Sequence, residues 1–365
     1  MTKPDYNNSI MNITNSVLKH YGIEPYHATL PIVDELLMKE YKNVVFLLMD
    51  GMGVNVLERN LPENAFLRKH LVCEISSVFP STTTAATTSV LTGKTPAEHG
   101  RIGWSCYFKE LDKCIDLFSN YESGTKEPAS IEHQADKCLS YTKFLDRIDK
   151  KVRTCKISPY WEYNASTMKS ICRHIKNLCE EDGSKFIYAY HSQPDNDMHH
   201  HGISSKFINV KMEKYNNQLE VLTNVLSDTL FIISADHGMT DITVKCIEDY
   251  PQISDSLIRH ICVEPRCCSM YVKDEYKAEF PGMFSSVFSD KFQLFTHDEF
   301  LQSGLLGEGE QHIRIDDFVG DYIAVAISDI TLWYKDINGK FKDSKAAHGG
   351  LTKEELCVPL IIIER

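Results

Sequence analysis

The chain has 365 residues, of which 42% are hydrophobic and 25% charged, and its 39 basic and 51 acidic residues give a net charge of −12. This composition is typical of a globular protein that buries a sizeable core. The acidic balance argues against a protein that binds nucleic acid polymers or membrane surfaces, because such proteins normally carry a basic field. The longest apolar runs, Val44–Met49 and Val358–Ile363, are far shorter than the ~20 residues that span a bilayer.

The N-terminal residues and the cysteines indicate a cytoplasmic location. Residues 1–17 contain no apolar stretch of the roughly 7–15 residues that a secretory signal needs. The 12 cysteines include no CxxC pair of the kind that holds structural zinc. We therefore expect reduced thiols in a cytoplasmic protein.

The first half of the chain predicts a helix followed by an α/β pattern. Residues 1–40 are expected to form an N-terminal helical lead-in, because apolar residues recur at helical spacing, at Ile10, Ile13, Val17 and Leu18. Asn43–Met49 is a continuous apolar run, as in a strand buried on both faces, and it ends at Asp50 before a glycine-rich turn. A second strand is expected over Val72–Phe79. Pro80, a Ser/Thr run and a helix of small residues reaching about Leu91 follow it.

The second half repeats the pattern of a buried strand followed by polar residues. Strands are expected at Phe186–Tyr190, Leu230–Ile233 and Val358–Ile363. Between the first two of these, a long helix over about Ser205–Leu226 is predicted to bury one face, formed by Phe207, Val210, Tyr215, Leu219 and Leu222.

Candidate metal ligands lie next to several of these strands. Ligands bind at the carboxyl ends of the strands in an open α/β sheet, so these side chains are expected to meet at one edge. A single aspartate there would mean little, because aspartate is also common in turns and helix caps. Asp195 and His199 are four residues apart, so both can project from one face of a helical turn. The candidate ligands are Asp50, Thr83, Asp195, His199, Asp236, His237 and His348.

This set suits two divalent cations. Three carboxylates and three imidazoles provide three protein ligands for each of two sites, with one hydroxyl beside them. Mixed histidine and aspartate coordination is typical of zinc, with manganese as the alternative metal.

Five segments resemble the alkaline phosphatase superfamily, and in particular its type I phosphodiesterase/nucleotide pyrophosphatase family. They are VVFLLMDGMG, FPSTTTAATTSVLTGKTPAEHG, HSQPDNDMHHHG, ISADHGM and AAHGGLTKEELCVPL, in the order of the family. The resemblance implies a three-layer αβα sandwich with a mostly parallel central sheet and small insertions. It also implies a two-zinc hydrolase of small-molecule phosphoesters or nucleotides that forms a covalent phospho-enzyme.

The resemblance implies a role for each candidate residue. Thr83 is the third residue after Phe79-Pro80, the position of the family's nucleophile. Asp50, Asp236 and His237 are then expected to hold the metal that binds Thr83. Asp195, His199 and His348 are expected to hold the other metal. The chemistry agrees, because a threonine hydroxyl is a poor nucleophile until metal coordination lowers its pKa.

Some alternatives stay open at this point. Thr82 and Thr84 are the alternative nucleophiles. The family's phosphate-contacting asparagine is replaced by Ala86, so a hydroxyl of Thr82, Thr84 or Thr87 is the candidate substitute. His200 and His201 do not fit the ligand spacing, and His99 is expected to be structural.

We expect one hydrolase domain over 1–365 with two insertions. The first, about 104–182, is rich in aromatic residues and is a candidate cap, in which Trp104 or Trp161 would face the substrate. The second, about 262–330, is expected to form a small βαβ lobe from Arg266–Lys273, Asp274–Ser285 and Phe292–Phe295.

A phosphodiesterase or nucleotide pyrophosphatase acting through Thr83 is the expected function. The alternatives are a phosphomonoesterase or phosphomutase of the same superfamily, or a noncatalytic metal-binding protein on a degenerate scaffold.

Overall fold

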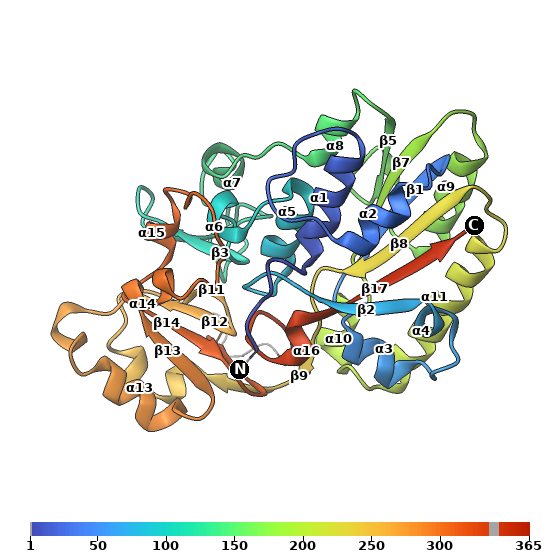
Figure 1. Ribbon diagram of the computed structural model, residues 1–365. Helices are drawn as coiled ribbons and strands as arrows, with labels where there is room; N and C mark the ends of the chain where they lie inside the picture. The colour runs from blue at the N-terminus through green and yellow to red at the C-terminus, as the bar shows by residue number, and fades with distance from the viewer. Residues whose placement is uncertain (1, 336–342) are drawn as a thin grey trace.

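The computed structural model describes residues 2–335 and 343–365 and contains a central seven-stranded sheet (Figure 1). The strand order is β2-β17-β8-β1-β7-β5-β6. The strands are β1 (Asn43–Met49), β2 (Leu71–Ser76), β5 (Arg153–Ser158), β6 (Tyr163–Asn164), β7 (Lys185–His191), β8 (Thr229–Ala235) and β17 (Cys357–Glu364). β1 pairs in parallel with β7 and β8, and β5 pairs in parallel with β6 and β7, whereas β17 runs antiparallel between β8 and β2. The predicted mostly parallel central sheet is confirmed.

Helices cover both faces of this sheet (Figure 1). Mutual helix contacts define one layer formed by α1 (Ile10–His20), α2 (Pro31–Leu37), α5 (Thr83–Thr92) and α8 (Phe144–Ile148). The other layer contains α3 (Val54–Asn60), α4 (Phe66–Lys69), α9 (Met168–Glu180), α10 (Asp195–His201) and α11 (Lys206–Thr223). The three-layer αβα arrangement is therefore as predicted.

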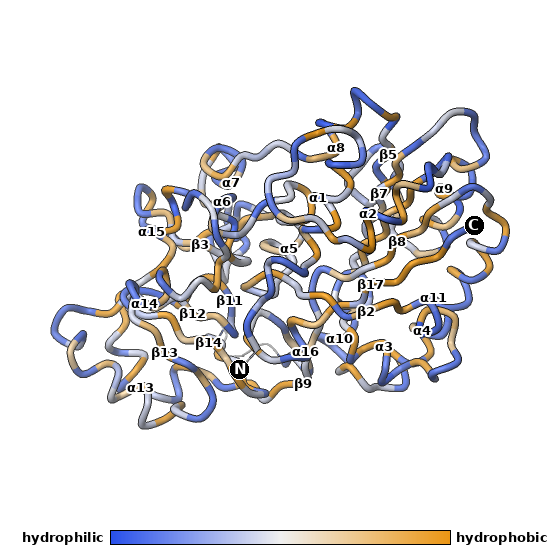
Figure 2. Tube along the Cα trace, in the orientation of Figure 1, coloured by the Kyte–Doolittle hydropathy of each residue, from blue (hydrophilic) through white to orange (hydrophobic). Residues whose placement is uncertain are grey.

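The inner strands follow directly from their apolar runs. Every residue of β1 and β8 is buried, because helices cover both faces of the sheet. Figure 2 shows hydrophobic residues along β17, while loops at the outer edges of the molecule are mostly hydrophilic. β2 is the edge strand and is only partly buried, and it ends at Ser76 rather than at Phe79.

Two helices show where the prediction from hydrophobic periodicity is confirmed and where it is wrong. The four apolar residues predicted to face the core at the N-terminus lie on α1 and are fully buried. The face predicted for α11 is wrong at Phe207 and Val210, which are 50% and 55% exposed. The buried stripe instead starts at Ile208 and continues through Met212 to Tyr215, a spacing that keeps one side of the helix toward the sheet. Leu219 and Leu222 lie on this stripe, as predicted.

A second sheet of six strands has the order β13-β14-β12-β11-β3-β4. Its strands are β3 (Ser105–Phe108), β4 (Lys113–Asp116), β11 (Cys262–Glu264), β12 (Cys267–Met270), β13 (Phe292–Thr296) and β14 (Tyr322–Ala326). The predicted strand–helix–strand unit corresponds to β12, α13 (Phe280–Phe288) and β13, but β14 lies between the two strands and pairs antiparallel with both. The segment 104–182 contributes β3 and β4 to this sheet and β5 and β6 to the central one.

Short elements complete the fold. The remaining strands are β9 (Thr240–Asp241), paired with β16 (Ala346–Ala347), and β10 (Thr243–Cys246), paired with β15 (Ile330–Trp333). The remaining helices are α6 (Pro96–His99), α7 (Gln134–Cys138), α12 (Pro251–Ser254), α14 (His297–Gln302), α15 (Ile315–Phe318) and α16 (Lys353–Leu356), with single 3-10 turns at Ile247–Asp249 and Asp274–Tyr276.

The cysteines depart from the expectation of reduced thiols at one place. Cys114 on β4 and Cys262 on β11 form a disulfide that ties two strands of the second sheet together. The other ten cysteines are free thiols. None of the helices in the described part of the chain is long and apolar enough to cross a membrane.

Candidate metal centre

The topology brings the predicted ligands to one edge of the central sheet. Asp50 follows β1 and Asp236 follows β8, and these strands are parallel neighbours, so their carboxyl ends lie side by side. β7, on the other side of β1, leads into α10, whose first residue is Asp195. β17 runs the opposite way, so its start lies at the same edge, and His348 precedes that strand. Thr83 is the first residue of α5.

The first group of potential ligands contains Asp50, Asp236 and His237, whose ligand atoms all lie within 4.8 Å of one another. His237 Nε2 is 3.3 Å from Asp50 Oδ1 and 3.6 Å from Asp236 Oδ2. Thr83 Oγ1 is 3.4 Å from Asp50 Oδ1 and 3.2 Å from His237 Nε2. The predicted nucleophile therefore lies beside the group that the resemblance assigned to it.

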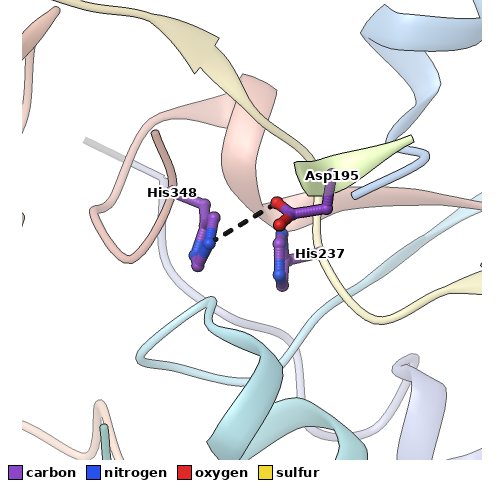
Figure 3. Close-up of side chains that lie close together, drawn as sticks. All are labelled: Asp195, His237 and His348. Carbon is purple, nitrogen blue, oxygen red and sulfur yellow. Dashed lines mark ion pairs between the residues drawn. The ribbon is translucent and has the colours of Figure 1, made fainter. Parts of the chain in front are cut away.

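The second group contains Asp195, His237 and His348, again within 4.8 Å (Figure 3). His348 Nε2 is 3.6 Å from Asp195 Oδ1, and its ring stacks on that of His237 with centroids 3.8 Å apart. His199 Nε2 lies 3.4 Å from the other oxygen of Asp195, Oδ2. His237 thus belongs to both groups, whereas the family resemblance implied that it belongs to the first group alone.

The three histidines share one hydrogen-bonding arrangement. In each, Nδ1 faces a backbone carbonyl oxygen: Ala346 O at 2.8 Å from His199, Gly238 O at 2.8 Å from His237, and Ser81 O at 3.2 Å from His348. A carbonyl oxygen can only accept, so Nδ1 carries a proton in each ring, and Nε2 is the nitrogen that faces the neighbouring aspartates. Protein-bound metals are commonly held by histidines oriented in this way.

The carboxylates also fit a pair of cations. Asp195 Oδ1 and Asp236 Oδ2 are buried and have no hydrogen-bond partner among the described residues. Burial and the neighbouring Asp50 raise the pKa of Asp236 well above its ordinary value. Burial alone would lower the pKa of His237, but Asp236 and Asp50 raise it to about 10. Such concentrated negative charge is costly in a buried site, and divalent cations would neutralise it.

The start of α5 singles out Thr83 within the Ser/Thr run. The Thr82 hydroxyl donates to Glu264 Oε1 at 2.6 Å, and the Thr84 hydroxyl is buried without a partner among the described residues. Thr87 donates to the carbonyl of Thr83, 2.6 Å away. Of the three candidate substitutes for the missing asparagine, the hydroxyls of Thr82 and Thr87 thus already donate within the protein, and that of Thr84 is buried. Ala86 itself is fully buried.

Two residues near the site were not identified from the sequence. Glu264 Oε1 accepts from the Thr82 hydroxyl and from the backbone N–H of Trp104 at 2.7 Å, and burial raises the pKa of Glu264 to about 7. Tyr190, on β7, donates its hydroxyl to Asp50 Oδ2. Tyr190 lies within an apolar strand, and Glu264 lies about 180 residues from Thr82, so no local sequence pattern points to either.

The remaining candidate residues lie outside the two groups. His200 and His201 are exposed, and His201 stacks on Phe207 with centroids 4.3 Å apart. His99 is buried and bonded to Ser89. Trp104 is 44% exposed and packs edge-on against Phe118, whereas Trp161 packs against Tyr188.

Solved structures with this fold are similar over most of their length. Human ectonucleotide pyrophosphatase/phosphodiesterase 5 superimposes with a TM-score of 0.67 at 14% identity, covering 88% of this chain and 87% of that one. The murine protein gives a TM-score of 0.65 at 15% identity and 88% coverage of both chains. Phosphonoacetate hydrolase from Sinorhizobium meliloti 1021 gives 0.63 at 15% identity, with 87% and 89% coverage. At these identities the likeness establishes the fold.

The sequence comparisons place the chain in a family. A search of the curated proteins found no match. Residues 44–279, more than half of the chain, match the family described as type I phosphodiesterase/nucleotide pyrophosphatase. The chain therefore belongs to the type I phosphodiesterase/nucleotide pyrophosphatase family.

Proposed function

We propose that the protein is a two-metal hydrolase of phosphoric esters, acting as a phosphodiesterase or nucleotide pyrophosphatase through a phosphothreonine on Thr83. The observation that carries the proposal is the position of Thr83 Oγ1, 3.4 Å from Asp50 Oδ1 and 3.2 Å from His237 Nε2 at the start of a helix. A hydroxyl in this position shares its surroundings with metal-ligating atoms, as an activated nucleophile requires.

The proposed ligands divide between two cations. Asp50, Asp236 and His237 would hold one beside Thr83. Asp195, His199 and His348 would hold the other. When bound, two divalent cations supply the positive charge that lowers the pKa of a hydroxyl and offsets charge on the phosphoryl oxygens. The mixed nitrogen and oxygen ligands favour zinc, with manganese as the alternative.

The chain's own residues then carry out two displacements. Thr83 Oγ1 gives up its proton to solvent and forms a bond to phosphorus, while the leaving-group oxygen departs with the electrons of the broken P–O bond and takes up a proton from solvent. Water next cleaves the phosphothreonine, which releases phosphate or a phosphomonoester and restores the hydroxyl. The backbone N–H groups of Thr83 and Thr84 are the first two of α5 and have no acceptor within the helix, so they favour an anion at this place.

The substrate is proposed to be a small phosphoester or nucleotide. Murine ectonucleotide pyrophosphatase/phosphodiesterase 5 has been solved in complex with AMP, and the phosphonoacetate hydrolase in complex with phosphonoformate. Both ligands are small and anionic, which supports the proposal. A phosphomonoesterase stays the second candidate because Ala86 offers no polar contact for a diester oxygen.

Substitution of Thr83 tests the proposal. Thr83→Ala is expected to bind the same amount of metal as the wild type by elemental analysis and to lose at least about 10³-fold in turnover of bis-p-nitrophenyl phosphate. Thr83→Ser is the matched control, since it retains a hydroxyl and should retain measurable turnover. If Thr83→Ala hydrolysed the substrate at the wild-type rate, Thr83 would not be the nucleophile. If the wild-type protein contained no bound metal, the noncatalytic alternative would be favoured. Comparison of the rates on p-nitrophenyl phosphate and on bis-p-nitrophenyl phosphate distinguishes a monoesterase from a diesterase.

The cytoplasmic location also stays a proposal. Ten free cysteines agree with a reducing compartment, but the disulfide between Cys114 and Cys262 is more typical of an oxidising one. Thiol counting on the protein isolated from its native cells, under conditions that block exchange, would decide between them: 12 free thiols support the cytoplasm, and ten oppose it.

A further inference from the structure

A cavity of about 680 Å³, which none of the candidate metal ligands lines, lies at the start of α9 and along α11 as far as Gln218. We call it the α9–α11 cavity. Met168 and Lys169 line it from α9, Lys206 and Phe207 from the start of α11, and His191 and Gln193 from the segment that follows β7. Its volume is in the range of about 300–1,000 Å³ that is usual for small-ligand sites.

Two helix N-termini meet at this cavity. α9 has 13 residues and begins at Met168, and α11 has 18 residues and begins at Lys206. Their capping side chains, Thr167 and Ser205, each accept from only the third amide of the helix. The first two N–H groups of each helix therefore have no acceptor among the described residues, and both helix dipoles place partial positive charge here.

The lysines add full charges of the same sign. Lys169, Lys206 and Lys214 line the cavity, and none of them forms an ion pair with another described residue. A fourth lysine, Lys211, is paired with Asp197. No aspartate or glutamate is among the lining residues. In a protein with a net charge of −12, such a cluster is a local exception that favours an anionic ligand.

A buried polar atom is also left without a partner at this cavity. The His191 side chain is only 2% exposed, and its Nε2 has no hydrogen-bond partner among the described residues. The ring is held edge-on against Tyr215, with centroids 5.2 Å apart. An unpartnered buried nitrogen costs free energy, and a ligand that reaches it would recover that cost.

The lining also contains apolar side chains. Phe207 is half exposed, and its ring stacks on His201 with centroids 4.3 Å apart, which leaves the other face of the ring. Met168 and Val210 also line the cavity. An exposed aromatic ring next to positive charges suits a ligand that has a flat ring at one end and an anion at the other.

We propose that the α9–α11 cavity is a second binding site, separate from the candidate metal centre, for a small molecule in which a phosphate dianion is attached to an aromatic ring system. The lysines and the helix N-termini bind the phosphate, and Phe207 packs against the ring. This site does not depend on the proposed hydrolysis, because none of the candidate metal ligands lines it.

Methionine methyl resonances can distinguish the two sites in one experiment. Met168 lines the cavity, whereas the Met198 methyl group lies against Gly51, beside Asp50 at the metal centre. Metal-loaded full-length Thr83→Ala protein, ¹³C-labelled at the methionine methyl groups, is titrated with AMP, which carries both a ring and a phosphate. Inorganic phosphate and adenosine test the two parts of the ligand separately.

We expect a saturable shift of the Met168 resonance with AMP. Lys206→Glu combined with Lys214→Glu should weaken this binding at least about tenfold, which corresponds to about 1.4 kcal/mol. The matched control, Lys150→Glu with Lys151→Glu, makes the same charge change at exposed lysines outside the cavity and should leave the affinity unchanged. An unaltered Met198 resonance in each ligand-free variant shows that the fold is retained.

Three results would overturn the proposal. One is a Met198 shift with no Met168 shift, which would place AMP at the metal centre alone. Another is equal affinity of the cavity variant and the control variant. The third is binding of adenosine as strong as that of AMP, which would remove the role of the phosphate. A Met168 shift in a protein whose wild type hydrolyses no phosphoester would leave this site standing while the proposed function fails.

Discussion

Arg266 and Glu355 form an ion pair that is completely buried, with Nε and Nη2 of the arginine donating to the two carboxylate oxygens at 2.6 and 2.7 Å. Arg266 precedes β12 in the second sheet, and Glu355 lies in α16 before β17 of the central sheet. Glu355 also accepts from the backbone N–H of Gly350 at 2.7 Å. The pair therefore joins the two sheets and anchors the loop that carries His348.

Removal of the arginine should strongly destabilise the fold. Arg266→Met leaves the Glu355 charge buried without its partner, so the free energy of unfolding is expected to fall by about 3–5 kcal/mol in a urea titration. Lys137→Ala breaks the exposed pair with Glu132 and is the control, for which we expect little change. An Arg266→Met protein as stable as the control would show that the two sheets are held together by other contacts.

Loss of one hydroxyl should weaken metal binding. Tyr190→Phe removes the donor to Asp50 Oδ2, which orients this carboxylate. Substitution of such supporting residues typically lowers metal affinity by about 10–100-fold, so a shift of this size is expected in competition with a chromogenic zinc chelator. Tyr322→Phe removes a hydroxyl that bonds to Lys277 O in the second sheet, and its zinc affinity should match that of the wild type. If both variants bind zinc equally, the contact of Tyr190 is dispensable.

Chelation should lower thermal stability. Without cations, the carboxyl groups of Asp50, Asp195 and Asp236 are buried without the metal ions that would bind them, whereas a cation at about 1,000 times its Kd stabilises the native state by about 4 kcal/mol. The Tm should therefore fall on addition of EDTA and recover with zinc in a calorimetric scan. Asp236→Asn should respond less, because one carboxylate of the first group is lost. A wild-type Tm that does not depend on EDTA would argue against buried cations.

His99 should make the fold sensitive to mild acid. Its Nδ1 accepts from the backbone N–H of Arg101 at 3.1 Å, so the proton is on Nε2, which faces Ser89 Oγ at 3.0 Å. Burial, together with Arg101, lowers the pKa of His99 from 6.5 to about 3. Between these values the unfolded chain binds a proton that the native state excludes, so stability is lost as the pH falls through this window.

The expected loss from this one group is about 2 kcal/mol between pH 8 and pH 5. Urea titrations at both pH values measure the free energy of unfolding. Between pH 8 and pH 5 this free energy should fall by about 2 kcal/mol less in His99→Gln than in the wild type. His200→Gln, at an exposed histidine, is the matched control. If His99→Gln loses as much stability between pH 8 and pH 5 as the wild type does, groups other than His99 set the acid sensitivity.

The sequence by itself determined the central layers and the order of the candidate ligands. Continuous apolar runs such as Asn43–Met49 are typical of strands that helices cover on both faces, so the strands and the edge to which they lead were predictable from local pattern. On α11, hydrophobic periodicity predicted the wrong burial for Phe207 and Val210, which are exposed and line the α9–α11 cavity. Their exposure depends on which elements pack against the helix, and the spacing of apolar residues in the sequence does not contain this information.

Only the tertiary structure decided how distant residues combine. The proximity of His237 to both ligand groups, the bond from Tyr190 to Asp50 and the insertion of β14 between β12 and β13 all depend on side chains or strands that are far apart in the chain. Cys114 and Cys262 are 148 residues apart and meet only because β3 brings their strands together. The local sequence pattern indicates which residues are buried and where the chain turns. Contacts between distant residues arise only when the whole fold packs.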